Sequence, residues 1–148
     1  MSRRTEPNRK KPLDVLDDVL AGHREAALGG PMVAAKYLER SLLANRSMPN
    51  ACKFFVYDLL AEASAAAGNT DRCREVVGLA REHLADAREG APKHLQDYQA
   101  KIRFYERGIG QAVTDGHLSV ALELCAEALA LGLGSFYAAK ADSIGRLL

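Results

Sequence analysis

The most informative segment of this chain spans residues 115–129 and reads Asp115-Gly116-His117-Leu118-Ser119-Val120-Ala121-Leu122-Glu123-Leu124-Cys125-Ala126-Glu127-Ala128-Leu129. An Asp-Gly pair predicts a tight turn, and the residues that follow it have the spacing of a helix. The side chains at positions 121, 125 and 128 are small and recur at steps of four and three, so they lie on one helical face. Small side chains let two helix axes approach closely. We therefore predict a turn followed by a helix that nests against the helix before it.

A second copy of this pattern surrounds Gly68, and a weaker one surrounds Gly29. A tyrosine lies eleven residues before each of the two stronger turn glycines, as Tyr57 and Tyr105. The residues five and twelve positions after each glycine are small: Cys73 and Ala80 in one copy, Ala121 and Ala128 in the other. Each unit is thus a helix with a bulky residue, a turn, and a helix with small residues. Such internal similarity indicates a repeat architecture.

Residues 115–129 closely resemble the second half of a tetratricopeptide (TPR) motif, and residues 70–80 resemble it less strongly. The resemblance extends over about residues 13–133. It implies antiparallel helix pairs arranged in a short right-handed superhelix. The turn glycines are 39 and 48 residues apart, not 34 as in that family, so we expect elongated helices and irregular superhelix geometry.

Hydrophobic periodicity predicts helices along the whole chain from residue 13, with almost no strand alternation. Glycine, proline and asparagine separate the helical stretches at short intervals. We expect an all-α protein of about seven helices: one from residue 13 to the glycines at 29 and 30, one from there to about 45, one at about 51–67, one between the turns at 68–71 and 89–92, and three at about 93–114, 118–131 and 135–147. The longest of them is 93–114, where Leu95, Tyr98, Ile102, Tyr105, Ile109 and Ala112 repeat at steps of three and four.

The first twelve residues differ from the rest. They hold five basic residues and one acidic residue, which leaves 15 basic and 18 acidic residues in 13–148. A short polar segment with two prolines cannot bury enough apolar surface to offset its ordering entropy, so we expect a disordered basic arm at 1–12 and one helical domain at 13–148. No apolar signal region follows Arg3-Arg4, and we expect a cytoplasmic protein. No stretch approaches the ~18 apolar residues of a membrane span.

The sequence lacks the usual motifs of catalytic and cofactor sites. Three widely spaced cysteines without a CxxC pair indicate reduced, buried thiols (Cys52, Cys73 and Cys125). The four histidines stand alone, and Gly108-Ile109-Gly110 belongs to neither phosphate-binding pattern. We therefore expect no enzyme activity, no metal and no cofactor.

The TPR resemblance also implies a binding surface, because in that family the inner faces of the first helices hold a partner peptide or helix. Carried over by spacing, the groove positions are Phe55, Asp58, Leu59 and Glu62 in one helix, and Arg103, Glu106, Arg107 and Gly110 in another. Arg103 and Arg107 resemble one half of the carboxylate clamp of chaperone-binding members. The other half would offer lysine and asparagine where this chain has Asp58 and Glu62, so we expect no binding of chaperone tails.

The expected function is therefore a non-enzymatic interaction module, a small scaffold or adaptor with a protein partner. One alternative is a nucleic-acid-associated regulator that uses the basic arm; another is a secretion-type chaperone that shields a partner helix. In the predicted helix 135–147, Phe136 and Leu147 lie away from the apolar stripe that packs against the preceding helix. We expect these two side chains to remain partly exposed and the chain to form a homodimer through them.

Overall fold

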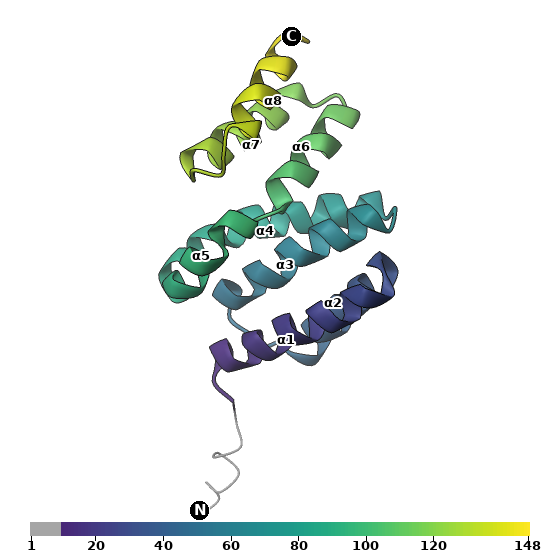
Figure 1. Ribbon diagram of the computed structural model, residues 1–148, viewed down its shortest axis with the longest axis vertical. Coiled ribbons are helices and arrows are strands. Elements are labelled where there is room, and N and C mark those ends of the chain that lie inside the picture. The colour runs from purple at the N-terminus through teal and green to yellow at the C-terminus, as the bar shows by residue number, and fades with distance from the viewer. Residues whose placement is uncertain (1–9) are drawn as a thin grey trace, which may run out of the picture.

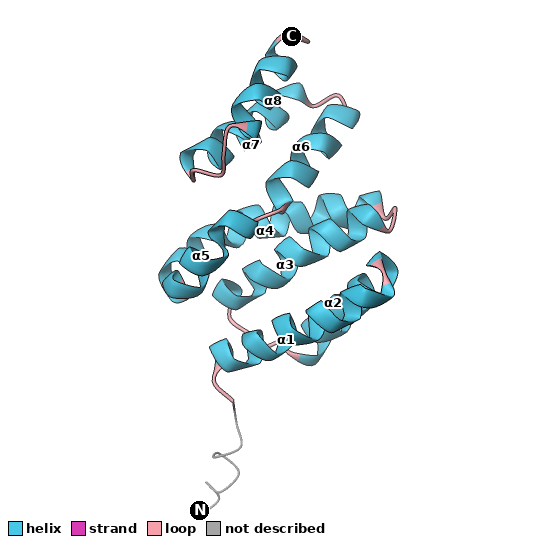
Figure 2. Cartoon of the chain, viewed as in Figure 1, coloured by secondary structure: helices cyan, strands magenta, loops and turns pink. Residues whose placement is uncertain are grey.

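The computed structural model describes residues 10–148, which form eight α-helices and two short 3-10 turns and contain no strand (Figure 2). The prediction of an all-α protein is confirmed. The α-helices are α1 (Pro12–Ala26), α2 (Pro31–Ala44), α3 (Asn50–Ala66), α4 (Thr70–Gly90), α5 (Pro92–Tyr98), α6 (Phe104–Thr114), α7 (Leu118–Ala130) and α8 (Phe136–Gly145). The 3-10 turns are Ala27–Gly29 and Gln99–Lys101.

The helices follow one another along the long axis of the molecule, with α1 at one end and α8 at the other (Figure 1). Most helices pack against the next one in sequence: α1 on α2, α2 on α3, α3 on α4, α6 on α7, and α7 on α8. Helix α6 packs on both α3 and α4, so it joins the C-terminal helices to the central pair. Helix α5 lies to one side of α3 and α4 in Figure 1.

Helices α3 and α6 end in the same way, at the two glycines that the sequence pattern aligned. Gly68 and Gly116 have φ angles of 82° and 79°, a left-handed conformation that glycine adopts without strain. The amide of the residue after each glycine donates to the carbonyl five residues earlier, over 2.8 Å in both turns: Asn69 to Ser64 and His117 to Ala112. This is the Schellman arrangement, which satisfies carbonyls left free at a helix end.

The core runs through the middle of the stack and is built on α3. Phe54 is fully buried and meets Phe104 of α6 edge to face, with ring centroids 6.0 Å apart. The small residues of the repeated pattern are buried as well: Cys73, Ala80, Ala121, Cys125 and Ala128. These positions therefore bring the second helix of each pair close to its neighbours.

We predict that Ala121→Leu destabilises the fold by roughly 1–3 kcal/mol, because three extra carbon atoms would overpack a contact that already excludes solvent completely. Ala126→Leu is the matched control, since Ala126 is exposed on the same helix. Urea unfolding followed by circular dichroism measures both changes. An unchanged midpoint for Ala121→Leu would contradict the close packing of α7.

The predicted helix at 93–114 is wrong, because the structure divides it into α5 and α6. The chain leaves the helical conformation at Ile102, whose ψ angle is 128°. The periodicity continues across this break because Ile102 and Tyr105 are both buried on the core side. A long-range interaction with Asp58, described below, stabilises the interruption.

Candidate functional site

Two surface hollows are lined by residues of α3 together with residues of α6 or its N-cap. The first has a volume of about 290 Å³ and forms where α1, α2, α3 and the start of α6 meet. The second has a volume of about 380 Å³ and lies between α3, α6 and α8. The first hollow is lined by His23, Ala27, Gly30, Pro31, Ala34, Leu59, Glu62, Ala63, Ala66 and Arg103. The second is lined by Ala65, Glu106, Arg107, Ile109, Gly110, Gln111, Thr114, Phe136 and Lys140.

An ion pair connects the two hollows. Arg107, which lines the second hollow, donates from Nε and Nη2 to the two carboxylate oxygens of Glu62, which lines the first, over 2.9 and 2.8 Å. Hydrogen bonding to Arg107 lowers the pKa of Glu62, so its carboxylate stays ionised and paired. The pair also links α3 to α6 at this surface. The two hollows are therefore neighbours on one continuous face.

Six of the eight positions that the TPR resemblance assigned to a groove line these hollows. Leu59, Glu62 and Arg103 line the first, and Glu106, Arg107 and Gly110 line the second. Arg103 precedes α6 as its N-cap residue, so Arg103 and Arg107 do not belong to one uninterrupted long helix.

Phe55 and Asp58 are not at this surface, and their assignment to an open groove is corrected by their burial, with 1% and 0% of their surface exposed. Phe55 packs edge to face against Phe54 and against Tyr98, with centroid separations of 5.2 Å in both pairs. Tyr98 ends α5, a segment that the sequence pattern had placed within a continuous helix. The chain leaves the helical conformation after α5, and in this arrangement Tyr98 contacts Phe55 and Asp58 of α3.

Asp58 joins three segments through its buried carboxyl group. Its Oδ1 accepts hydrogen bonds from the backbone amides of Arg103 and Phe104 over 2.9 and 2.7 Å, and its Oδ2 accepts one from the Tyr98 hydroxyl over 2.6 Å. The two amides belong to the first residues of α6, where backbone donors lack partners within the helix. Burial raises the pKa of Asp58 to about 6, although all three hydrogen bonds oppose the shift. Asp58 is a structural cap supplied from another helix.

Other residues of the two hollows were not assigned to the groove from the sequence. In the first hollow most of them are small or flank the α1–α2 turn, such as Ala27, Gly30 and Pro31. The glycine and proline signals locate this turn correctly, but they do not show that it faces α3. In the second hollow, Phe136 and Lys140 come from α8, which periodicity alone does not orient toward α6.

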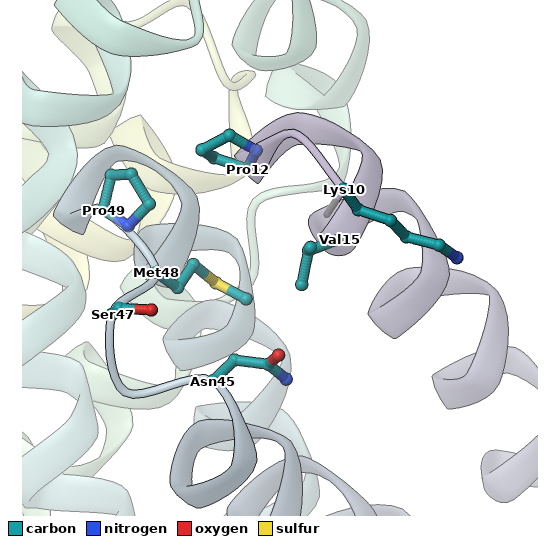
Figure 3. Close-up of a pocket in the computed structure, with 7 residues that line it drawn as sticks. All are labelled: Lys10, Pro12, Val15, Asn45, Ser47, Met48 and Pro49. Atoms are coloured by element: carbon teal, nitrogen blue, oxygen red, sulfur yellow. The ribbon is translucent and has the colours of Figure 1, made fainter. Parts of the chain in front are cut away.

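A larger hollow, of about 650 Å³, lies near the start of α1 (Figure 3). Its lining residues come from the start of α1 and from the α2–α3 connection: Lys10, Pro12, Val15, Asn45, Ser47, Met48 and Pro49. Lys10 and Pro12 belong to the predicted basic arm, and the other lining residues were not assigned a functional role from the sequence. Of the predicted arm 1–12, residues 1–9 lie outside the described part, and Pro12 begins α1.

The three cysteines are free and buried. Burial raises the pKa of each thiol, which disfavours the nucleophilic thiolate. In residues 10–148 no group of three or more histidine, cysteine, aspartate or glutamate side chains could hold a metal ion. Over the same residues, no helix has both the length and the apolar character that crossing a membrane requires.

Comparison of the chain with protein-family models, with curated proteins and with solved structures found no match. The function must therefore be inferred from the surface geometry described above.

Proposed function

We propose that this chain is a non-enzymatic protein–protein interaction module, a small scaffold or adaptor, that binds a peptide or helix of a partner along the face formed by α3 and α6. The observation that carries the proposal is the lining of two neighbouring hollows by Leu59, Glu62, Arg103, Glu106, Arg107 and Gly110. A concave surface with a few polar groups offers both apolar anchoring and orientation to a ligand.

A TPR-like arrangement of the helix pairs is part of this proposal. Supporting it, α3–α4 and α6–α7 share the same glycine turn and bury small residues at the same two offsets after it. At Gly29 the corresponding offsets fall on Ala34 and Ser41, which are also buried. In such a stack the first helix of each pair lies on one side, as α3 and α6 do at the two hollows.

Asp58 and Glu62 repel a carboxylate ligand less than their sequence positions suggest, because Asp58 is buried beneath three hydrogen-bond donors and Glu62 is paired with Arg107. This face therefore accepts a negatively charged group more readily than the sequence alone implied.

Site-specific photo-crosslinking in the host cell tests the proposed face. A photoreactive phenylalanine analogue is placed at His23, an aromatic side chain that lines the first hollow, or at Glu106, which lines the second. Glu82, exposed on α4 and outside both hollows, is the control position. We expect the same partner protein to be crosslinked from positions 23 and 106 and not from 82. A partner captured equally from position 82, or from none of the three, would contradict the proposal.

Self-association through α8 is a separate prediction. Phe136 and Leu147 expose 50% and 64% of their surface. We expect a homodimer at micromolar concentration that Phe136→Glu converts to a monomer, because a charge would replace a large apolar contact. Sedimentation equilibrium makes the measurement, with Ala138→Glu on the exposed surface of α8 as the control. A wild-type chain that sediments as a monomer would contradict the homodimer, and α8 would then only cap the end of the helical stack.

A further inference from the structure

The first hollow combines an apolar wall with a single exposed cation. Its aliphatic lining comes from Ala34 of α2, from Pro31 at the start of that helix, and from Leu59, Ala63 and Ala66 of α3. Its volume of about 290 Å³ lies at the lower limit of small-molecule pockets. A hollow of this size suits one or two side chains inserted from a partner, as in the anchored contacts of protein interfaces.

Arg103 supplies the positive charge at this hollow. Within residues 10–148, it takes part in no ion pair. The two nearby carboxylates are already committed, Glu62 to Arg107 and Asp58 to three buried donors. His23 does not supply a second firm charge, because burial, together with Arg103, lowers its pKa. A carboxylate on a bound segment would therefore find Arg103 available.

The α1–α2 turn carries exposed apolar side chains that follow, in sequence, residues lining the hollow. Leu28 follows Ala27 and exposes 88% of its surface; Met32 and Val33 follow Pro31 and expose 62% and 47%. These three side chains form an apolar rim, of which Met32 also lines a separate hollow between α2 and α3. Apolar side chains concentrated at one place on a surface indicate an interaction site.

We propose that the first hollow and this apolar rim bind an acidic, amphipathic segment of a partner protein, with an apolar side chain in the hollow and a side-chain carboxylate on Arg103. The inference rests on the proposed function and adds the chemistry of the partner. A concave site favours an inserted side chain over the flat surface of an anionic membrane. The arginine favours a carboxylate because its planar guanidinium can bond both oxygens.

Two synthetic helical peptides of roughly 15 residues test the proposal. They share one leucine face and carry either glutamate or lysine on its flanks, and both are amidated so that only side-chain carboxylates differ. Fluorescence anisotropy with the full 148-residue chain measures their affinity, and amide chemical shifts of the labelled chain locate the contact. We expect the glutamate peptide alone to bind, with shifts concentrated at Ala34, Leu59 and Ala63.

Substitutions in the hollow separate the two parts of the contact. Arg103→Gln removes the cation and Ala66→Trp fills the hollow, and each should weaken binding of the glutamate peptide by about tenfold. Arg103→Lys keeps the charge but loses the two parallel hydrogen bonds of the guanidinium, so its affinity should lie between those of the wild type and Arg103→Gln. Arg146→Glu is the control, because Arg146 is exposed beyond the end of α8, at the opposite end of the molecule (Figure 1). Melting curves establish that each variant is folded.

Three results would overturn this inference: no binding of the glutamate peptide at about 1 mM, equal binding of the lysine peptide, or binding unaffected by both Arg103→Gln and Ala66→Trp. Sedimentation with vesicles rich in phosphatidylserine is run in parallel. Arg103-dependent binding to those vesicles without binding of the glutamate peptide would also overturn it, in favour of a lipid surface. The photo-crosslinks at positions 23 and 106 use neither peptide, so a specific crosslink with a negative peptide result would reject only the acidic chemistry of the partner.

Discussion

Asp58→Ala should lower the free energy of unfolding at pH 5 by about 3–4 kcal/mol, because it leaves buried donors without an acceptor. The amide of Phe104 and the hydroxyl of Tyr98 would lose hydrogen bonds of 2.7 and 2.6 Å, and the amide of Arg103 would lose one of 2.9 Å. Each unsatisfied buried group costs about 1–3 kcal/mol. We also expect the first turn of α6 to become mobile, since its cap comes only from this side chain.

Urea unfolding at pH 5 measures the loss, and hydrogen exchange of the Phe104 amide reports on the start of α6. Asp71→Ala is the matched control, because Asp71 lies in the first turn of α4 with its side chain 94% exposed. Its surface ion pair with Arg74 contributes little, so we expect a change within about 0.5 kcal/mol. Equal effects of the two substitutions would contradict the role of Asp58 as a cap.

The second large effect is a pH dependence that belongs to Asp58. Burial raises the pKa of this carboxyl from 3.8 to about 6, so the folded chain binds a proton that the unfolded chain releases. The resulting stability is fully present below about pH 4 and is lost as the pH rises through 6. Over that interval the change amounts to roughly 3 kcal/mol, since one pKa unit corresponds to about 1.4 kcal/mol.

Asp58→Asn isolates this contribution. The amide resembles the protonated acid: its oxygen can accept from Arg103 and Phe104, and its nitrogen can donate to the Tyr98 hydroxyl. Relative to the wild type, the asparagine variant should gain stability as the pH rises from 4 to 7.5, by an amount approaching roughly 3 kcal/mol. Urea unfolding across this pH range gives the difference in unfolding free energy between the two chains. Contributions from the other titrating groups are the same in both chains and cancel. A constant difference would show that the pKa of Asp58 is not raised on folding.

Local sequence signals located most of the helices correctly. Glycine can adopt the left-handed conformation that ends α3 and α6, and proline suits the first turn of a helix, as predicted at Pro31. Pro12, which the sequence assigned to the disordered arm, also begins a helix, because its missing amide is not needed there. Periodic apolar residues and small residues at fixed offsets then identified the buried faces, including Cys73 and Ala121. These signals act over a few residues, which is why a single sequence contains them.

The candidate site was only partly predictable for the same reason. The TPR resemblance placed Leu59 and Glu62 on one helix and Glu106 and Arg107 on another, as the structure does, whereas Arg103 precedes α6; all five line the two hollows. The ion pair of Arg107 with Glu62 joins residues 45 positions apart. No local pattern shows that these two charges neutralise each other.

The all-α class, the glycine turns and the faces that carry small side chains could be predicted from the sequence alone, because each depends on the conformational preferences of neighbouring residues. The break within 93–114 and the role of Asp58 as the cap of α6 could be seen only in the tertiary structure. The apolar repeat across Tyr98, Ile102 and Tyr105 is compatible with a continuous helix, and an interruption would leave backbone amides without partners. Asp58 supplies that partner to the amides of Arg103 and Phe104 from 45 and 46 residues away, so the buried carboxyl stabilises a break that local preferences do not favour.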